Sequence, residues 1–138
     1  MMFELELDAC NAQAGRSART ALVAYLAREA TGTMPPDGVV ETIFTELLAN
    51  VCKHAGHWAK TTVTWRNDGR AVLRVRDHGP GFDMSLWQPP SELSEGGRGL
   101  LIASALADDF SIRTENQGHG CCIEAVLPAR RRPPVRAA

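Results

Sequence analysis

The stretch TELLANVCKHAG, residues 45–56, completes an amphipathic pattern that begins near Val40 and predicts a helix. Apolar residues recur there at spacings of three and four over more than three turns, which is the strongest helical signal in the chain. At 100° per residue, Glu46, Asn50 and Lys53 lie within about 60° of one another, nearly opposite the apolar face. Such a polar stripe is either a solvated helix face or one wall of a binding site.

Regular patterns on both sides of this helix predict the other elements. Alternation from Phe3 to Leu7 indicates a strand, and Asn11 is placed to cap a helix near residues 12–30. Asp37 is placed to cap the central helix in the same way. The remaining predictions are strands near 61–66 and 70–77 around an Asn-Asp-Gly turn, a helix over 100–109, and strands over 110–115 and 121–127.

Helices interspersed with hairpins predict an α+β fold, a two-layer sandwich in which helices cover one face of a mixed, mostly antiparallel sheet. Periodicity does not say which strand pairs with the first one. We expect one domain over residues 1–128. The basic segment ARRRPPVR, with two prolines and no apolar period, predicts a disordered tail over residues 129–138.

The composition of the chain limits the classes of function that it can have. The chain has 138 residues, 44% of them hydrophobic, and a formal net charge of −1, which favours neither nucleic acid nor an anionic membrane. The acidic, alternating N-terminus does not resemble a signal peptide, so we expect a cytoplasmic protein. Its cysteines are then expected to be reduced and mostly buried. Cys52, His54 and His57 match no standard zinc spacing.

A second motif, LRVRDHGPGFD over residues 73–83, ends a predicted strand at Asp77. A carboxylate at a strand end can accept a hydrogen bond from an exocyclic amine such as the N6 amine of adenine. Gly79 and Gly81 remove side chains where a backbone must turn or approach a ligand closely. The plainer interpretation is an ordinary strand exit.

A third motif, GGRGLL over residues 96–101, opens a predicted helix. Backbone N–H groups at a helix start, with the helix dipole behind them, suit phosphate oxygens. The motif is neither a Rossmann turn nor a Walker loop, so alone it is a weak signal.

The three motifs together resemble the Bergerat-type ATP-binding fold of histidine kinases, gyrase, Hsp90 and MutL. They have the form E-x-x-x-N (Glu46 to Asn50), D-x-G-x-G (Asp77 to Gly81) and G-x-G-L (Gly97 to Leu100). The resemblance covers residues 3–127. The small size and the form ELLANVCKHA look most like the serine-protein kinase anti-sigma factors.

This resemblance implies a role for each matching residue. Glu46 would be the general base, and Asn50 would hold Mg²⁺ through its side-chain oxygen. Asp77 would bind the adenine amine. The other implied assignments are Gly79 and Gly81 to the adenine pocket, residues 82–98 to the ATP lid, the backbone of Gly97, Arg98, Gly99 and Leu100 to the phosphates, and Arg98 or Lys53 to phosphate charge.

The implied function is an ATP-dependent serine/threonine protein kinase that sequesters a sigma factor and phosphorylates an antagonist protein. Homodimerisation is plausible by the same resemblance. One alternative is a module in which ATP only gates protein binding. Another is the catalytic domain of a two-component histidine kinase acting in trans, although no dimerisation helix pair with an acceptor histidine precedes the domain in this sequence.

Overall fold

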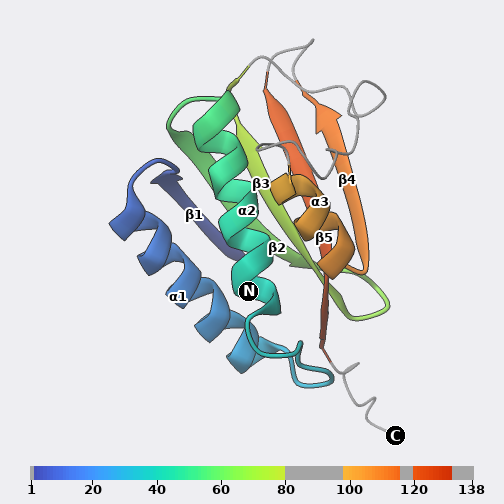
Figure 1. Cartoon of the computed structure of the whole chain (residues 1–138). Coiled ribbons are helices and arrows are strands. Elements are labelled where there is room, and N and C mark those ends of the chain that lie inside the picture. Colours follow the sequence, from blue (N-terminus) through green and yellow to red (C-terminus); the bar gives the residue numbers. More distant parts are fainter. Residues whose placement is uncertain (1, 80–97, 116–119, 132–138) are drawn as a thin grey trace, which may run out of the picture.

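The computed structural model describes residues 2–79, 98–115 and 120–131, in which the helices and strands follow the order that the sequence patterns predict (Figure 1). The elements along the chain are β1 (Phe3–Asp8), α1 (Ala12–Glu29), α2 (Val39–His54), β2 (Trp58–Trp65), β3 (Arg70–Asp77), α3 (Arg98–Leu106), β4 (Asp109–Thr114) and β5 (Cys121–Arg130).

The strands form one sheet in the order β1-β2-β3-β5-β4. Each neighbouring pair among the described strands is antiparallel, so the sheet is antiparallel rather than mixed. β1 pairs with β2, which answers the question that periodicity left open. All three helices lie against the same face of the sheet, so the predicted α+β two-layer sandwich is confirmed (Figure 1).

The core lies between the helices and this face of the sheet. α2 is at its centre, because the predicted apolar face of that helix is almost completely buried. Its buried residues are Val40, Ile43, Phe44, Leu47, Leu48 and Val51. They pack with residues of α1, such as Leu22 and Leu26, and with alternate residues of the strands, such as Leu73 and Ile123. The orientation of α2 is therefore fixed by its apolar side, which leaves the polar stripe facing elsewhere.

The other face of the sheet carries charged side chains that pair across strands. Arg74 Nε lies 2.9 Å from Glu124 Oε2, and Lys60 Nζ lies 2.7 Å from Glu4 Oε1. These pairs are partly exposed to solvent, and surface pairs stabilise a fold by only about 0–1 kcal/mol each.

The two predicted helix caps differ in outcome. Asn11 caps α1 as predicted, because its side-chain oxygen accepts a hydrogen bond from the Ala14 N–H at 2.9 Å. The prediction for Asp37 is wrong. α2 begins after Gly38, which adopts a left-handed conformation with φ of 83° and makes no side-chain cap. The chain turns one residue later than the pattern indicated, so the Asp37 carboxylate is not at the cap position.

The C-terminal boundary also needs correction. β5 continues to Arg130, and Ala129 is buried, so residues 129–131 belong to the fold rather than to a tail. The Arg131 guanidinium lies 4.3 Å from the centre of the Trp65 ring and 3.7 Å from Glu29. The rest of the predicted tail, residues 132–138, lies outside the described part of the chain.

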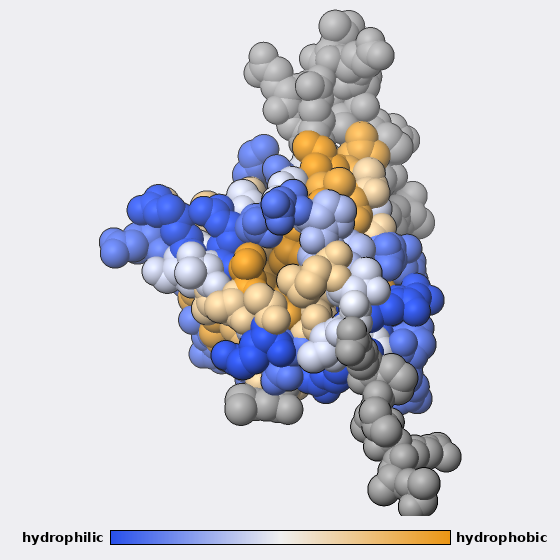
Figure 2. Space-filling view, turned by 90° about the horizontal axis from the view of Figure 1, so that it is seen from below, coloured by the Kyte–Doolittle hydropathy of each residue, from blue (hydrophilic) through white to orange (hydrophobic). Residues whose placement is uncertain are grey.

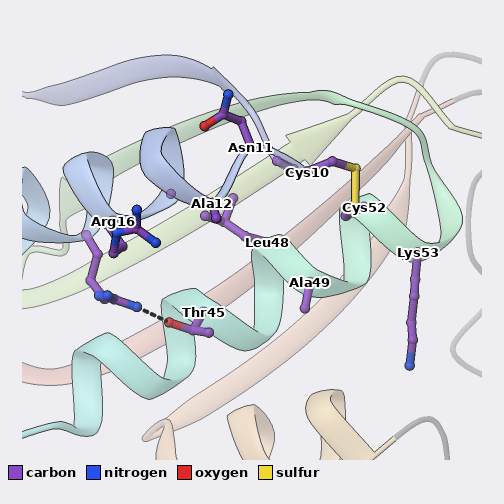
Figure 3. Close-up of a pocket in the computed structure, with 12 residues that line it drawn as sticks. Cys10, Asn11, Ala12, Arg16, Thr45, Leu48, Ala49, Cys52 and Lys53 are labelled. Carbon is purple, nitrogen blue, oxygen red and sulfur yellow. Dashed lines mark hydrogen bonds between the residues drawn. A yellow bond between two sulfur atoms is a disulfide. The ribbon is translucent and has the colours of Figure 1, made fainter.

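The cysteines were predicted to be reduced and mostly buried, and half of that prediction is wrong. Cys121 and Cys122 are free and buried, as expected. Cys10 and Cys52 are exposed and form a disulfide, with Cα atoms 5.0 Å apart. They come together because the last turn of α2 lies beside the junction of β1 and α1, an arrangement that sequence spacing does not reveal (Figure 3).

None of the helices in the described ranges is long and apolar enough to cross a membrane. Seen from below, the surface has apolar residues near its centre and hydrophilic residues around them (Figure 2). Larger apolar side chains that are exposed include Met34 before α2 and Leu101 and Ile102 on α3. Single exposed apolar residues of this kind are normal on a folded domain.

Candidate functional site

Asp77 lies at the end of β3 and is 6% exposed, an unusual position for a carboxylate. Its Oδ1 accepts a hydrogen bond from the Gly79 N–H at 2.9 Å. Burial raises the pKa of Asp77 above its ordinary value, while hydrogen bonds from the Gly79 and Cys121 N–H groups oppose that shift. A buried carboxylate held by backbone donors is well placed to receive an amine from a ligand, as the second motif predicts.

Gly79 is pressed against the end of α2. A Cβ atom added to Gly79 would lie 2.5 Å from Ala55 Cβ and 2.7 Å from Ala55 Cα, so a larger residue would push the strand exit away from the helix. The Gly79 carbonyl oxygen accepts a hydrogen bond from the Gly120 N–H at 2.6 Å, which ties this exit to the start of β5. The second motif is thus fixed against the helix that carries the first.

The third motif meets the same helix near its middle, at Glu46. A Cβ atom added to Gly99, in the first turn of α3, would collide with the carboxylate oxygen Oε2 of Glu46. α3 can therefore approach α2 closely only because position 99 lacks a side chain. Leu100, the next residue, is 6% exposed and anchors α3 in the core.

The remaining members of the polar stripe lie further along α2. Asn50 is half-buried, one turn from Glu46. Its side-chain amide offers an oxygen that can serve as a ligand. Lys53 is exposed, and its side chain points away from the disulfide (Figure 3). Its proposed contact with phosphate stays a prediction.

A separate groove of about 560 Å³ lies between α1 and α2 (Figure 3). Its lining is mainly apolar and includes Gly15 and Leu48, with Arg16 and Arg19 contributed by α1. The Arg19 guanidinium donates to Thr45 Oγ1 at 3.1 Å across this groove. Of the predicted site residues Lys53 lines it, whereas Glu46, Asn50 and Asp77 do not, so the groove is distinct from the place where the motifs meet.

Several predicted residues cannot be placed. Gly81, Gly97 and most of the predicted lid lie outside the described residues. Arg98 begins α3, but its side chain is also outside the described part of the structure. The motif positions that the structure does place are Glu46, Asn50, Asp77, Gly79, Gly99 and Leu100.

Two residues that matter for this arrangement were missed. Ala55 provides the small surface against which Gly79 packs. Gly120 has φ of 83°, and a Cβ atom there would lie 2.9 Å from the Asp77 carbonyl oxygen. The sequence placed Gly120 only in a hairpin turn. Its contact with the second motif depends on the pairing of β3 with β5, which no local pattern predicts.

The Cys121 thiol beside this site makes a testable contribution to stability. Burial raises the pKa of Cys121 from 9.0 to about 12, and the neighbouring charge of Asp77 adds to the shift. Between these values the folded chain keeps a proton that the unfolded chain loses, so stability falls as pH rises above 9. We expect the free energy of unfolding to fall by roughly 1 kcal/mol between pH 8 and pH 10 because of this group.

Urea unfolding at the two pH values measures that fall. Cys121→Ala removes the titrating thiol, so the free energy of unfolding of this variant should fall by roughly 1 kcal/mol less over the same interval than that of the unsubstituted chain. An equal loss in both proteins would show that Cys121 is not the source. All samples keep the disulfide between Cys10 and Cys52, so those two cysteines do not titrate. Burial also raises the pKa of the Cys122 thiol, which is present in both proteins and cancels in the comparison.

These placements fit a nucleotide with a metal ion. Asp77 offers a buried carboxylate, and the half-buried Asn50 offers an amide oxygen, a hard ligand that suits Mg²⁺. Glycines lie at the two points where the exit of β3 and the start of α3 come close to α2. The start of α3 faces Glu46, so backbone N–H groups at this helix start and an acidic group adjoin the same space.

Comparisons with known proteins point to one family. A family model of the histidine kinase-like ATPase domain matches residues 9–126. The chain is 29% identical, over 70% of its length, to the signal transduction histidine-protein kinase AfsQ2 of Streptomyces coelicolor, and it spans 20% of that protein.

Two solved structures share the fold. The mycobacterial sensor histidine kinase MprB has a TM-score of 0.55 at 16% identity, over 94% of this chain and 100% of that one. The Acinetobacter baumannii histidine kinase AdeS has a TM-score of 0.54 at 17% identity, over 93% of this chain and 68% of that one. At these identities the likeness concerns the fold alone.

Proposed function

Because the chain belongs to the histidine kinase-like ATPase family, we propose that it binds ATP with Mg²⁺ and transfers the γ-phosphoryl group to a protein side chain in trans. The observation that carries this proposal is the convergence of three separate motifs on α2. Gly79 packs against Ala55 at one end of the helix, and Gly99 packs against Glu46 nearer its middle. The contact at Glu46 places α3 against the polar stripe, which an ordinary solvated helix face would not show.

Within this proposal each placed residue has a task. Asp77 accepts a hydrogen bond from the adenine amine, and Gly79 shapes the adenine pocket by keeping the exit of β3 close to α2. Asn50 holds Mg²⁺, which would neutralise charge on the phosphates when bound. Backbone N–H groups at the start of α3, near Gly99, would contact phosphate oxygens. Arg98 and Lys53 remain the candidates for a cation near the phosphates.

Glu46 favours a serine or threonine acceptor. A hydroxyl must lose its proton as its oxygen forms the new bond to phosphorus and the bond between the γ-phosphorus and the β,γ-bridging oxygen breaks, releasing ADP. A carboxylate positioned beside the start of α3 can take that proton. This chemistry is the basis for proposing serine/threonine kinase activity in a regulatory switch, with an antagonist protein as substrate and a sigma factor as second partner.

The named relatives favour a second candidate, in which the acceptor is a histidine of another protein or segment. AfsQ2, MprB and AdeS are all named as histidine kinases. A neutral imidazole has a nitrogen lone pair that can attack phosphorus without prior loss of a proton, so it needs no carboxylate base. Under this candidate the chain is a catalytic ATP-binding domain, and Glu46 serves binding or positioning.

A third possibility is that ATP only gates the binding of a protein partner. Both kinase candidates and the gating module require ATP. Because ATP is supplied in the cytoplasm, we propose that the protein is located there.

The deciding experiment follows the phosphorylated product. The chain is incubated with Mg²⁺ and γ-labelled ATP, together with proteins from a native lysate, and labelled proteins are treated with acid and with alkali. Phosphoserine and phosphothreonine survive acid, whereas phosphohistidine survives alkali and is lost in acid. A label stable to acid supports the hydroxyl acceptor, and a label lost in acid supports the histidine acceptor.

Titration with a non-hydrolysable ATP analogue separates the other outcomes. Binding without any labelled protein would favour the gating module over both kinase candidates. Absence of saturable, Mg²⁺-dependent binding would contradict the proposed function as a whole.

A further inference from the structure

Four potential metal ligands meet at the junction of β1, α1 and α2, away from the motifs described above. Asp8, Cys10 and His57 each offer one ligand atom, and these three atoms all lie within 4.8 Å of one another. Cys52 joins them through its disulfide to Cys10. The ligand atoms therefore include two sulfurs, one carboxylate oxygen and one imidazole nitrogen.

The backbone holds this cluster in place. The Ala9 N–H donates to the His57 carbonyl oxygen at 2.6 Å, so the end of β1 is fixed to the chain that enters β2. The Asp8 carboxylate accepts the Cys10 N–H at 2.9 Å and lies 3.0 Å from His57 Nδ1. These two contacts hold the Asp8 carboxylate beside the imidazole of His57 and the backbone of Cys10.

Cys52 adds a feature that suits a cation. It lies in the last turn of α2, where the unpaired carbonyl groups of a helix carry partial negative charge. Cys10 Sγ also lies 3.6 Å from the Gly56 carbonyl oxygen. A sulfur in a disulfide has no proton to donate, so this contact becomes a hydrogen bond only in the thiol form. The surroundings of both sulfurs are thus rich in oxygen atoms.

We propose that reduction of the disulfide converts this cluster into a Zn²⁺ site. The ligands are Asp8, Cys10, Cys52 and His57. Two thiolates with an imidazole and a carboxylate form a four-coordinate set of the kind that Zn²⁺ prefers over harder ions. Zn²⁺ places its ligands about 2.0–2.3 Å away, so side-chain rotations are enough to bring the three clustered atoms around one ion.

The disulfide and the metal exclude each other. A dithiol reductant transfers two electrons and two protons to the Cys10–Cys52 bond and becomes a disulfide itself, leaving two thiols. Zn²⁺ then binds both sulfurs as thiolates and releases the two thiol protons. A reducing compartment favours the dithiol, so the metal-bound form is expected there and the disulfide form under oxidation.

The test uses the full chain without nucleotide, so its outcome does not depend on the proposed function. The protein is reduced with a metal-free phosphine and titrated with Co²⁺, whose visible spectrum reports tetrahedral thiolate ligation, and then with Zn²⁺ in competition with a chelator. We expect one ion per chain. Binding should weaken at least about tenfold in His57→Ala and in Cys52→Ser, because each loses a ligand.

His54→Ala is the matched control, because His54 is also exposed and lies two residues from Cys52 but is outside the cluster. Its affinity should equal that of the unsubstituted chain, and the oxidised chain should show no thiolate spectrum. Circular dichroism confirms that each variant is folded. Equal affinities of His57→Ala and His54→Ala, or absence of a tetrahedral spectrum from the reduced chain, would overturn the proposal.

Discussion

Glu46→Gln is expected to lower the rate of phosphoryl transfer by about 10²–10⁴-fold, because glutamine cannot take the proton of an attacking hydroxyl. ATP affinity should stay close to that of the unsubstituted chain, since glutamine preserves the shape that packs against Gly99. Single-turnover transfer to the labelled acceptor and titration with the ATP analogue measure the two quantities separately.

Glu41→Gln is the matched control for this substitution. Glu41 lies in the first turn of the same helix and is also half-buried, but it does not meet α3 at Gly99. Its substitution should change neither quantity. If Glu46→Gln transfers phosphate at the normal rate, Glu46 is not the base. A label that is also lost in acid would then favour a histidine acceptor.

Asp77→Asn is expected to weaken ATP binding by about 10–150-fold, which corresponds to the loss of about 1.5–3 kcal/mol from a hydrogen bond to a charged group. Asparagine keeps an oxygen that can accept the Gly79 N–H, so the strand exit should stay in place. Isothermal titration with the ATP analogue and Mg²⁺ measures the loss. Asp109→Asn, at the exposed start of β4, is the control.

The same substitution should not lower stability. Burial raises the pKa of Asp77, so the folded chain holds this proton more tightly than the unfolded chain does, and ionisation at neutral pH opposes folding. Removing the charge should leave the midpoint of thermal unfolding at pH 7 unchanged or raise it. A marked fall in the midpoint would mean that Asp77 serves the fold rather than a ligand.

Local patterns were enough to predict most elements of this fold. The apolar spacing of α2, the alternation in β1 and the Asn-Asp-Gly turn between β2 and β3 each act over a few residues, and the structure confirms them. The Asn11 cap is local in the same sense. Asp37 was mispredicted because the turn at Gly38, rather than a side-chain cap, begins α2.

The site was only partly predictable for a related reason. Motif residues could be named from their resemblance to a family, but the contacts between Gly79 and Ala55 and between Gly99 and Glu46 depend on how α2 packs. The role of Gly120 likewise depends on the pairing of β3 with β5. The disulfide between Cys10 and Cys52 depends on where the end of α2 lies. Each of these joins residues far apart in sequence.

The two glycine contacts fix the distance along α2 between the residue that meets α3 and the residue that meets the exit of β3. Glu46 and Ala55 are nine residues apart, a rise of about 13.5 Å along an α-helix, and each added residue turns the helix by about 100°. A one-residue insertion or deletion between them would therefore change both the spacing and the angle between the two contact points. We expect insertions and deletions to be tolerated in the surface turns of this chain but not within residues 47–54.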